Sequence, residues 1–384
     1  MTAPEGRSTT SVHGHLLRRQ ADDPVVLPVY QTTTYVNAIG SDREVLYARY
    51  GNTPNQLAVA RKYAMLEGSE AGVVVGSGMA ATALAHLAVL RPGDQLVASS
   101  WIYGGTRKFF DEELGRFNIS VSYVDPSQHR GWRRAIRENT RAIFFESPTN
   151  PTLRVIDPAP IAQIALETGI ALLVDSTFAS PINFRPLQHG ADIVITSGTK
   201  YLNGHSDVTA GLIASTKSYI DEVVRLSRSW GTAIDPHAAW LLDRGMKTLE
   251  LRVCRQNANG AAVAAWAAGQ AGITAVHYPG LADHPDHEIA SRILDGYGGM
   301  VGIVLAGGTV GAERFLRRLR IFTHAPSLAG VESLVSEPRV TSHAGLSPAE
   351  REAIGIPDGF VRLSCGIEDA ADLIGDLAQA LDGT

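Results

Sequence analysis

Four features that could do chemistry lie just after short β-branched runs of this sequence: Lys200, Asp175, the glycine turn 76–80 and Tyr103. Open α/β sheets bind ligands at the carboxyl ends of their strands, so all four features can face one ligand. A glycine turn that starts a helix presents backbone N–H groups to an anion such as phosphate. A lone lysine after a strand is usually a solvated surface residue, and a glycine turn alone is a weak signal. The prediction of a ligand site therefore depends on the combination of all four features.

An anion cradle, a carboxylate, an aromatic ring and a lysine together are typical of a pyridoxal phosphate site. The lysine forms a Schiff base with this cofactor, and the carboxylate keeps the pyridine nitrogen protonated. Without that proton the ring is a poor electron sink. We therefore predict that Lys200, Asp175 and Tyr103 surround pyridoxal 5'-phosphate.

The elements that must position these residues can be predicted from hydrophobic periodicity. From residue 71 onward, short apolar runs alternate with stretches of helical period, which indicates a mostly parallel sheet flanked by helices. The expected strands are 72–75, 95–98, 119–124, 142–145, 170–174 and 193–195. The expected helices are 79–90, 105–117, 132–139, 160–168, 237 to about 269 with an interruption near 257–260, and 370–381.

The pattern divides the chain into three parts. Residues 1–55 are polar, lack a helical period and are expected to form an extended arm that packs on something else. Residues 56–245 contain the alternating pattern and are predicted to be a large, cofactor-binding α/β domain. Residues 246–384 change to a smaller α+β mixture, predicted to be a second domain.

Composition excludes several classes of protein. The chain has 34 Lys plus Arg and 39 Asp plus Glu, a net charge of −5, so no broad basic field is available for nucleic acid or anionic lipid. Two cysteines cannot form a disulfide framework or a cysteine-based zinc site. No signal peptide and no apolar run of ~18 residues is readable. These observations favour a cytoplasmic enzyme without a nucleic-acid or membrane partner.

Short motifs built from these residue types run in order along nearly the whole chain. They are Gln31-Thr-Thr-Thr-Tyr35, Tyr47-Ala-Arg49 with Asn52-Thr-Pro54, Gly76-Ser-Gly-Met79, Glu146-Ser-Pro-Thr-Asn-Pro151, Val174-Asp-Ser-Thr-Phe178, Ser197-Gly-Thr-Lys200 and Arg362-Leu-Ser-Cys-Gly-Ile-Glu368. In this order they resemble the Cys/Met-metabolism family of pyridoxal phosphate enzymes, which includes cystathionine γ-synthase, cystathionine γ-lyase and methionine γ-lyase. The resemblance implies a fold-type I pyridoxal phosphate transferase-like fold, with a mostly parallel sheet and a smaller α+β carboxy-terminal domain.

The resemblance also implies roles for matching residues. Lys200 would bind the cofactor covalently and carry protons, Asp175 would pair with the pyridine nitrogen, and Tyr103 would stack on the ring and serve as a proton donor. The residues expected at the phosphate are Gly78, Met79, Ser197 and Thr199, with Tyr47 and Arg49 reaching the site of the neighbouring subunit.

The substrate would be a small amino acid. Arg362, with Asn150, would bind its α-carboxylate, a bidentate task suited to guanidinium, and Ser327 lies in the family's loop near the substrate. The family resemblance further suggests a homotetramer, a dimer of dimers in which each active site is shared between two chains.

Two reactions fit the same site. In γ-elimination, cystathionine or methionine gives 2-oxobutanoate, ammonia and a thiol; in γ-replacement, a thiol adds instead. The segment Tyr103-Gly-Gly-Thr106 resembles the lyases and synthases, from which β-lyases usually depart further, and methionine γ-lyases often have cysteine in place of Gly105. Pro326 stands where these enzymes usually have glutamate, which removes a partner for a distal ammonium. The sequence therefore favours a γ-eliminating, cystathionine γ-lyase-like enzyme over a γ-synthase acting on an O-acylated homoserine, and over a catalytically inactive scaffold.

The remaining histidines and cysteines receive structural interpretations. His284 and His287 are three residues apart in a proline-containing loop, but no third ligand is apparent, so we expect a solvated loop and no metal site. Cys254 and Cys365 are expected to be small buried residues.

Overall fold

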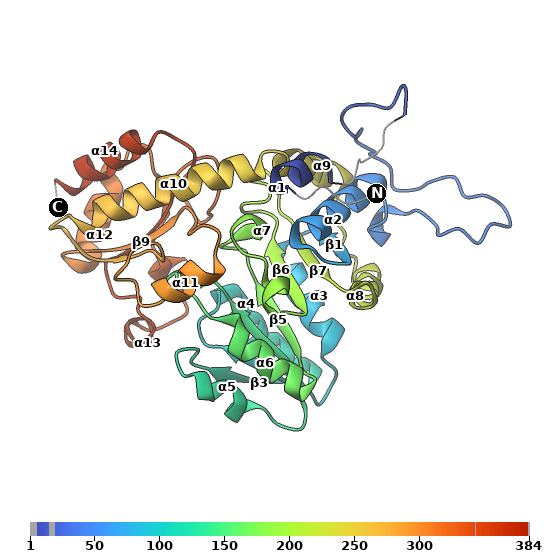
Figure 1. The fold of residues 1–384 in the computed structure, drawn as a ribbon, viewed down its shortest axis with the longest axis horizontal. Helices are drawn as coiled ribbons and strands as arrows, with labels where there is room; N and C mark the ends of the chain where they lie inside the picture. Colours follow the sequence, from blue (N-terminus) through green and yellow to red (C-terminus); the bar gives the residue numbers. More distant parts are fainter. Residues whose placement is uncertain (1–5, 15–19, 342, 383–384) are drawn as a thin grey trace.

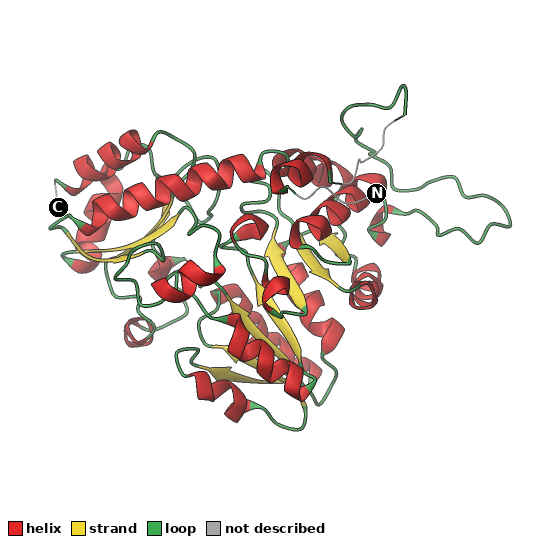
Figure 2. Ribbon diagram, viewed as in Figure 1, coloured by secondary structure: helices red, strands yellow, loops and turns green. Residues whose placement is uncertain are grey.

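The computed structural model describes residues 6–14, 20–341 and 343–382. Within them lie two sheets, one of seven and one of five strands, separated along the chain by a long helix, and both sheets are flanked by helices (Figures 1 and 2). The seven-stranded sheet comprises β1 (Ala71–Val75), β2 (Gln95–Ser99), β3 (Ser120–Val124), β4 (Thr140–Glu146), β5 (Ala171–Asp175), β6 (Ile193–Ser197) and β7 (Gly211–Ser215). The predicted fold class, a mostly parallel sheet with a second smaller sheet domain, is confirmed.

The strand order of the large sheet is β1-β7-β6-β5-β4-β2-β3. Every pair from β6 to β3 is parallel, whereas β7 runs antiparallel to both of its neighbours. β7 was not predicted from the sequence, because only one of its five residues, Ile213, is β-branched. Gly211 is required there because a Cβ atom would come within 2.1 Å of the Ser77 carbonyl oxygen. The close approach brings β7 against the turn that precedes α3.

Helices cover both faces of this sheet. On one face Leu84 of α3 and Val223 of α8 pack on apolar strand residues, and on the other face Val59 of α2, Leu242 of α9 and Ile161 of α6 do so. The flanking elements are α2 (Pro54–Glu67), α3 (Gly78–Val89), α4 (Gly104–Lys108), η2 (Phe109–Glu113), η3 (Leu114–Phe117), α5 (His129–Ala135), α6 (Pro158–Thr168), α7 (Ser180–Asn183), η4 (Pro186–His189), α8 (Lys217–Trp230) and α9 (Pro236–Met246).

The five-stranded sheet has the order β10-β11-β12-β9-β8 and is antiparallel except between β10 and β11. Val263 of α10, Phe315 of α12 and Leu373 of α14 pack together in its core. The elements are α10 (Leu249–Ala268), β8 (Ile273–His277), α11 (His287–Ile293), β9 (Met300–Leu305), α12 (Gly308–Arg318), β10 (Thr323–His324), β11 (Leu334–Ser336), η5 (Pro338–Val340), α13 (Pro348–Ala353), β12 (Phe360–Ser364) and α14 (Ala370–Leu381). The exact division at residues 245 and 246 stays a prediction.

The long helical region is broken at a different place from the predicted one. The expected interruption near 257–260 is wrong: α9 ends at Met246, and α10 is continuous from Leu249 to Ala268. The helix-breaking residue types serve tertiary contacts instead. A Cβ atom on Gly260 would lie 2.5 Å from the Gly298 carbonyl oxygen, and Asn259 donates to the carbonyl oxygens of Gly366 and Glu368. Tertiary packing therefore overrides weak helix propensity here.

The amino-terminal arm is extended only in part. Residues 7–13 form a helix, α1 (Arg7–His13), that packs against α2 and α10, which corrects the expectation of an arm without helix. A short turn, η1 (Ala48–Tyr50), lies near its end. Between them, the segment carrying Val36 and Ile39 projects away from the body, with both side chains fully exposed (Figure 1). In the described part of the chain, no helix is both long and apolar enough to cross a membrane.

Candidate active site

The residues predicted to bind the cofactor and substrate, except Tyr47 and Arg49, line one cavity of about 560 Å³. It lies at the carboxyl ends of β4, β5 and β6, where Glu146, Asp175 and Ser197 end adjacent parallel strands. The predicted residues found at its wall are Gly78, Met79, Tyr103, Asn150, Asp175, Ser197, Thr199, Lys200, Ser327 and Arg362. The structure thus brings together residues that are up to 284 positions apart in the sequence, from Gly78 to Arg362.

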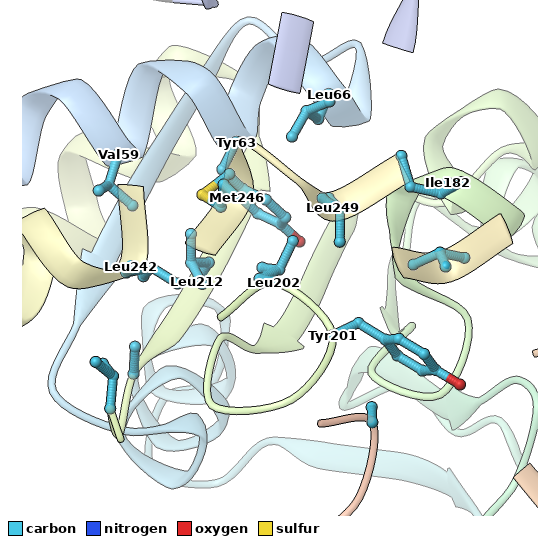
Figure 3. Packing of buried hydrophobic residues seen from close by; sticks show 14 of the residues in the cluster. Val59, Tyr63, Leu66, Ile182, Tyr201, Leu202, Leu212, Leu242, Met246 and Leu249 are labelled. Carbon is cyan, nitrogen blue, oxygen red and sulfur yellow. The ribbon is translucent and has the colours of Figure 1, made fainter. Parts of the chain in front are cut away.

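Lys200 is positioned by a turn whose following residues are fixed in the core. Tyr201 and Leu202 are buried in the cluster that also contains Tyr63, Met246 and Leu249 (Figure 3). The Lys200 Nζ donates to the Ser327 hydroxyl at 3.0 Å. Burial, with the positive charge of Arg362, lowers the pKa of the amine to about 8. Lys200 therefore loses its proton more easily than an ordinary lysine, as a nucleophile or base requires.

Asp175 ends β5 and lines the cavity. Its Oδ1 accepts the backbone N–H of Thr177 at 2.8 Å, which fixes the carboxyl group. Burial raises its pKa to about 6, because the ionised form is poorly solvated there. A cationic partner such as a protonated ring nitrogen would stabilise that charge.

The amino-terminal end of α3 forms the other side of the cavity. Ser77 caps this twelve-residue helix by accepting the N–H of Ala80, whereas the N–H groups of the first helical residues have no partner within the helix. A Cβ atom on Gly78 would lie 2.9 Å from the Ser197 hydroxyl, so only glycine leaves this concave space open. The Thr199 hydroxyl is fixed beside it by the N–H of Ala210 at 3.0 Å. N–H and hydroxyl donors around an open cradle fit a phosphate group.

Arg362, in the middle of β12, presents a buried guanidinium group to the cavity. Nη1 donates to Asn150 Oδ1 at 2.7 Å and Nη2 to the Ser327 carbonyl oxygen at 3.1 Å, while Nε has no hydrogen-bond partner in the described part of the chain. Burial lowers its pKa to about 10, which still leaves it protonated at neutral pH. Among the described residues, no carboxylate forms an ion pair with it. A buried cation with neutral partners only fits an anionic ligand, such as a substrate carboxylate.

Tyr103 stands at the cavity mouth with 41% of its surface exposed. Its backbone N–H donates to Glu146 Oε1 at 2.8 Å, and its ring lies against Gly105, where a Cβ atom would come within 2.5 Å of the ring. Gly105 therefore lets the ring occupy this place. Glu146 is a cavity residue to which sequence reasoning assigned no role, although it ends a buried strand as Asp175 does.

Tyr47 and Arg49 do not join this cavity. Arg49 lines a separate hollow of about 290 Å³, and its guanidinium carbon lies 5.5 Å from the Tyr47 ring centre and 5.1 Å from that of Tyr50. Its Nη1 donates to the carbonyl oxygen of Arg228. Within one chain these two residues are therefore away from Lys200.

Two smaller interpretations are corrected. His284 is buried rather than solvated: it accepts the N–H of Asp286 at 3.2 Å, and burial lowers its pKa to about 4. His287 begins α11 with Nδ1 at 2.9 Å from the Pro279 carbonyl oxygen, and the described residues contain no group of three potential metal ligands. Cys365 is buried as expected, but Cys254 is exposed because it lies on the outer face of α10.

The sheet, the cradle at α3, and the lysine and aspartate that line the same cavity define a fold-type I pyridoxal phosphate enzyme. The chain belongs to the Cys/Met metabolism PLP-dependent enzyme family, whose model matches residues 8–382. Its cofactor is pyridoxal phosphate, and the donor set described above fits it.

Relatives of several activities are similarly close. The chain is 40% identical to a cystathionine beta-lyase of Lactococcus lactis subsp. cremoris over 97% of this chain and 98% of the relative, and 38% identical to an L-methionine gamma-lyase of Pseudomonas putida over 98% and 97%. It is also 40% identical to a cystathionine gamma-synthase of Mycobacterium tuberculosis over 98% and 97%. These identities refer to whole chains, so the expectation that β-lyases depart further in the segment 103–106 stays a prediction.

Solved structures show the same fold. A cystathionine gamma synthase from Xanthomonas oryzae pv. oryzae, in complex with aminoacrylate and cysteine, superimposes with a TM-score of 0.95 at 35% identity, covering 99% of this chain and 98% of that one. A cystathionine gamma-lyase from Lactobacillus plantarum, complexed with L-serine, gives a TM-score of 0.93 at 32% identity, with 98% of each chain covered.

Proposed function

We propose that the enzyme is a γ-eliminating carbon–sulfur lyase that converts methionine or cystathionine, with water, to 2-oxobutanoate, ammonia and a thiol. The observation that carries this proposal is the charge content of the cavity. Of the described residues at its wall, Arg362 and Lys200 are the only cations. γ-Replacement with cysteine requires a second α-carboxylate to be bound in the site, as does cystathionine itself, and the described wall offers no second guanidinium for it. Methionine, which has one carboxylate and an uncharged γ-substituent, therefore fits this cavity better than cystathionine does.

The bound cofactor supplies an electron sink that stabilises negative charge beside the substrate amine. The residues of the chain then have separate roles. Arg362 and Asn150 bind the α-carboxylate and so orient the Cα–H bond, while Asp175 keeps the ring nitrogen protonated. The neutral Lys200 Nζ takes the Cα proton and returns it elsewhere on the substrate. The Tyr103 hydroxyl, at the cavity mouth, donates a proton to the departing sulfur.

A product assay distinguishes elimination from replacement. Purified enzyme is incubated with methionine or cystathionine alone, and separately with cysteine plus an O-acylated homoserine. We expect 2-oxobutanoate and thiol from the first incubations. Cystathionine formed only when both co-substrates are present would establish the γ-synthase instead, and pyruvate from cystathionine would establish β-elimination.

Pro326 is proposed to limit the use of cystathionine. It lines the cavity next to Ser327 and offers neither charge nor N–H to a distal ammonium group. Pro326→Glu should raise kcat/KM for cystathionine relative to methionine, since a charge-assisted hydrogen bond contributes about 1.5–3 kcal/mol. Pro326→Gln is the matched control, because it changes the loop backbone equally without adding a charge. An unchanged substrate ratio in Pro326→Glu would contradict the proposal.

We also propose that two chains share each active site in a homo-oligomer, a tetramer by family resemblance. Support comes from the arm: Arg49 lies outside the cavity of its own chain, and the preceding arm projects with exposed Val36 and Ile39. The expected test result is complementation between Arg49→Ala and Lys200→Ala subunits. After random exchange half the dimers are mixed, each with one intact site, so activity should return to roughly a quarter of wild type. Verified exchange without recovered activity would place Arg49 in its own chain's site.

A further inference from the structure

Glu146 is a buried acidic residue of the cavity for which the mechanism above has no use. It ends β4, and its backbone stands in register with Asp175 on the adjacent parallel strand β5. Its Oε1 accepts the backbone N–H of Tyr103 at 2.8 Å. One side chain therefore connects the strand beside Asp175 to the residue that carries the aromatic ring.

The two neighbouring carboxyl groups cannot both ionise at low cost. Burial, together with the negative charge of Asp175, raises the pKa of Glu146 well above its usual range. The pKa of Asp175 rises less, to about 6, because its carboxylate accepts hydrogen bonds from Thr177. The other charged groups at the cavity wall, Lys200 and Arg362, form no ion pair with Glu146. The pair therefore holds one negative charge at neutral pH, and Asp175 carries it.

We propose that Glu146 is a positioning residue that acts as a neutral carboxylic acid, fixing Tyr103 over the cofactor ring through its backbone N–H while leaving Asp175 as the only anion facing the ring nitrogen. The inference rests on the proposed site. A neutral carboxyl group can serve here because its carbonyl oxygen still accepts the N–H of Tyr103. A second negative charge would compete with Asp175 for the ring proton.

Two variants separate this role from its alternatives. Glu146→Gln keeps the length, the carbonyl acceptor and the neutral state, and Glu146→Leu keeps the approximate volume but removes the acceptor. We expect the glutamine variant to keep kcat within about threefold of wild type, a change smaller than one lost hydrogen bond, with the absorbance band of the bound cofactor and its pH dependence unchanged. The leucine variant should lose roughly 10-fold to 100-fold in kcat, as for loss of one buried hydrogen bond, with a smaller change in KM.

If Glu146 acts by positioning Tyr103, the loss of activity in Glu146→Leu should depend on the presence of the Tyr103 ring. In a Tyr103→Ala background, Glu146→Leu should cause little further loss, because there is no ring left to position. Measurements comprise the kinetics, the dissociation constant of pyridoxal phosphate and the cofactor spectrum of each holoenzyme. A large loss in Glu146→Gln would show that the ionised carboxylate is needed and would overturn the inference. So would full activity in Glu146→Leu, or losses that simply add in the double variant.

A wrong assignment of the cofactor site can be distinguished from a wrong role for Glu146. Wild-type enzyme that binds pyridoxal phosphate elsewhere, or does not respond to Lys200→Ala, would overturn the site itself, whatever the Glu146 variants do. An active, Lys200-dependent wild type with unaffected Glu146→Leu would overturn the inference alone.

Discussion

A Lys200→Ala variant is expected to lose turnover by a factor on the order of a thousand or more while it still folds, because an amine that carries protons in the reaction is removed. Its Nζ donates a hydrogen bond to the Ser327 hydroxyl, and the residues that follow it, Tyr201 and Leu202, are buried in the core (Figure 3). The loss should therefore fall on chemistry rather than on stability. The measurement is kcat for 2-oxobutanoate release, with circular dichroism and thermal unfolding to verify the fold.

The matched control for this variant is Lys217→Ala. Lys217 is exposed on α8 and pairs with Asp221 one helical turn away, far from the cavity wall. Its removal should leave kcat unchanged, because an exposed pair contributes little to stability. Turnover near the wild-type level in Lys200→Ala would contradict the site assignment.

Asp175→Asn is expected to reduce kcat on the order of a hundredfold to a thousandfold while cofactor is still bound, because the amide cannot hold the ring nitrogen protonated. The negative charge of Asp175 should also make the affinity for the cofactor depend on pH. Burial raises the pKa of Asp175 to about 6 in the cofactor-free chain, so its carboxylate becomes neutral as the pH falls below that value. Cofactor affinity in the wild type should therefore decrease from pH 7 to pH 5, and the asparagine variant should lack this decrease. Exchange of the substrate Cα proton at the wild-type rate in Asp175→Asn would show that the role is misassigned.

The site was predictable largely because its residues follow buried strands. Asp175 and Lys200 are found by that rule, since the carboxyl ends of neighbouring parallel strands meet at one edge. Arg362 and Ser327 come from the second sheet domain, and periodicity gives no means of placing them against the first. Only the family resemblance indicated them, and in the structure both line the cavity.

The wrong predictions from the sequence share a physical cause. Each depends on tertiary contacts, which a local sequence pattern does not reveal. β7 was missed because its glycine is there for close approach to Ser77, and the supposed break in α10 consists of residues that serve packing against neighbouring segments. His284 has the same explanation, since a histidine in a polar loop can still be buried by the element that folds over it. Glu146 could have been found, because it satisfies the strand-end rule used for Asp175.

Borohydride reduction of the holoenzyme, followed by peptide mass spectrometry, tests most directly whether this cavity is the active site. Reduction fixes pyridoxal phosphate to the lysine amine that holds it, so the modified peptide identifies the residue. We expect the label on Lys200 alone, with the buried Lys62 (paired with Asp243 at 2.6 Å) unmodified. A label on Lys62 or on another lysine, with Lys200 unmodified, would contradict it.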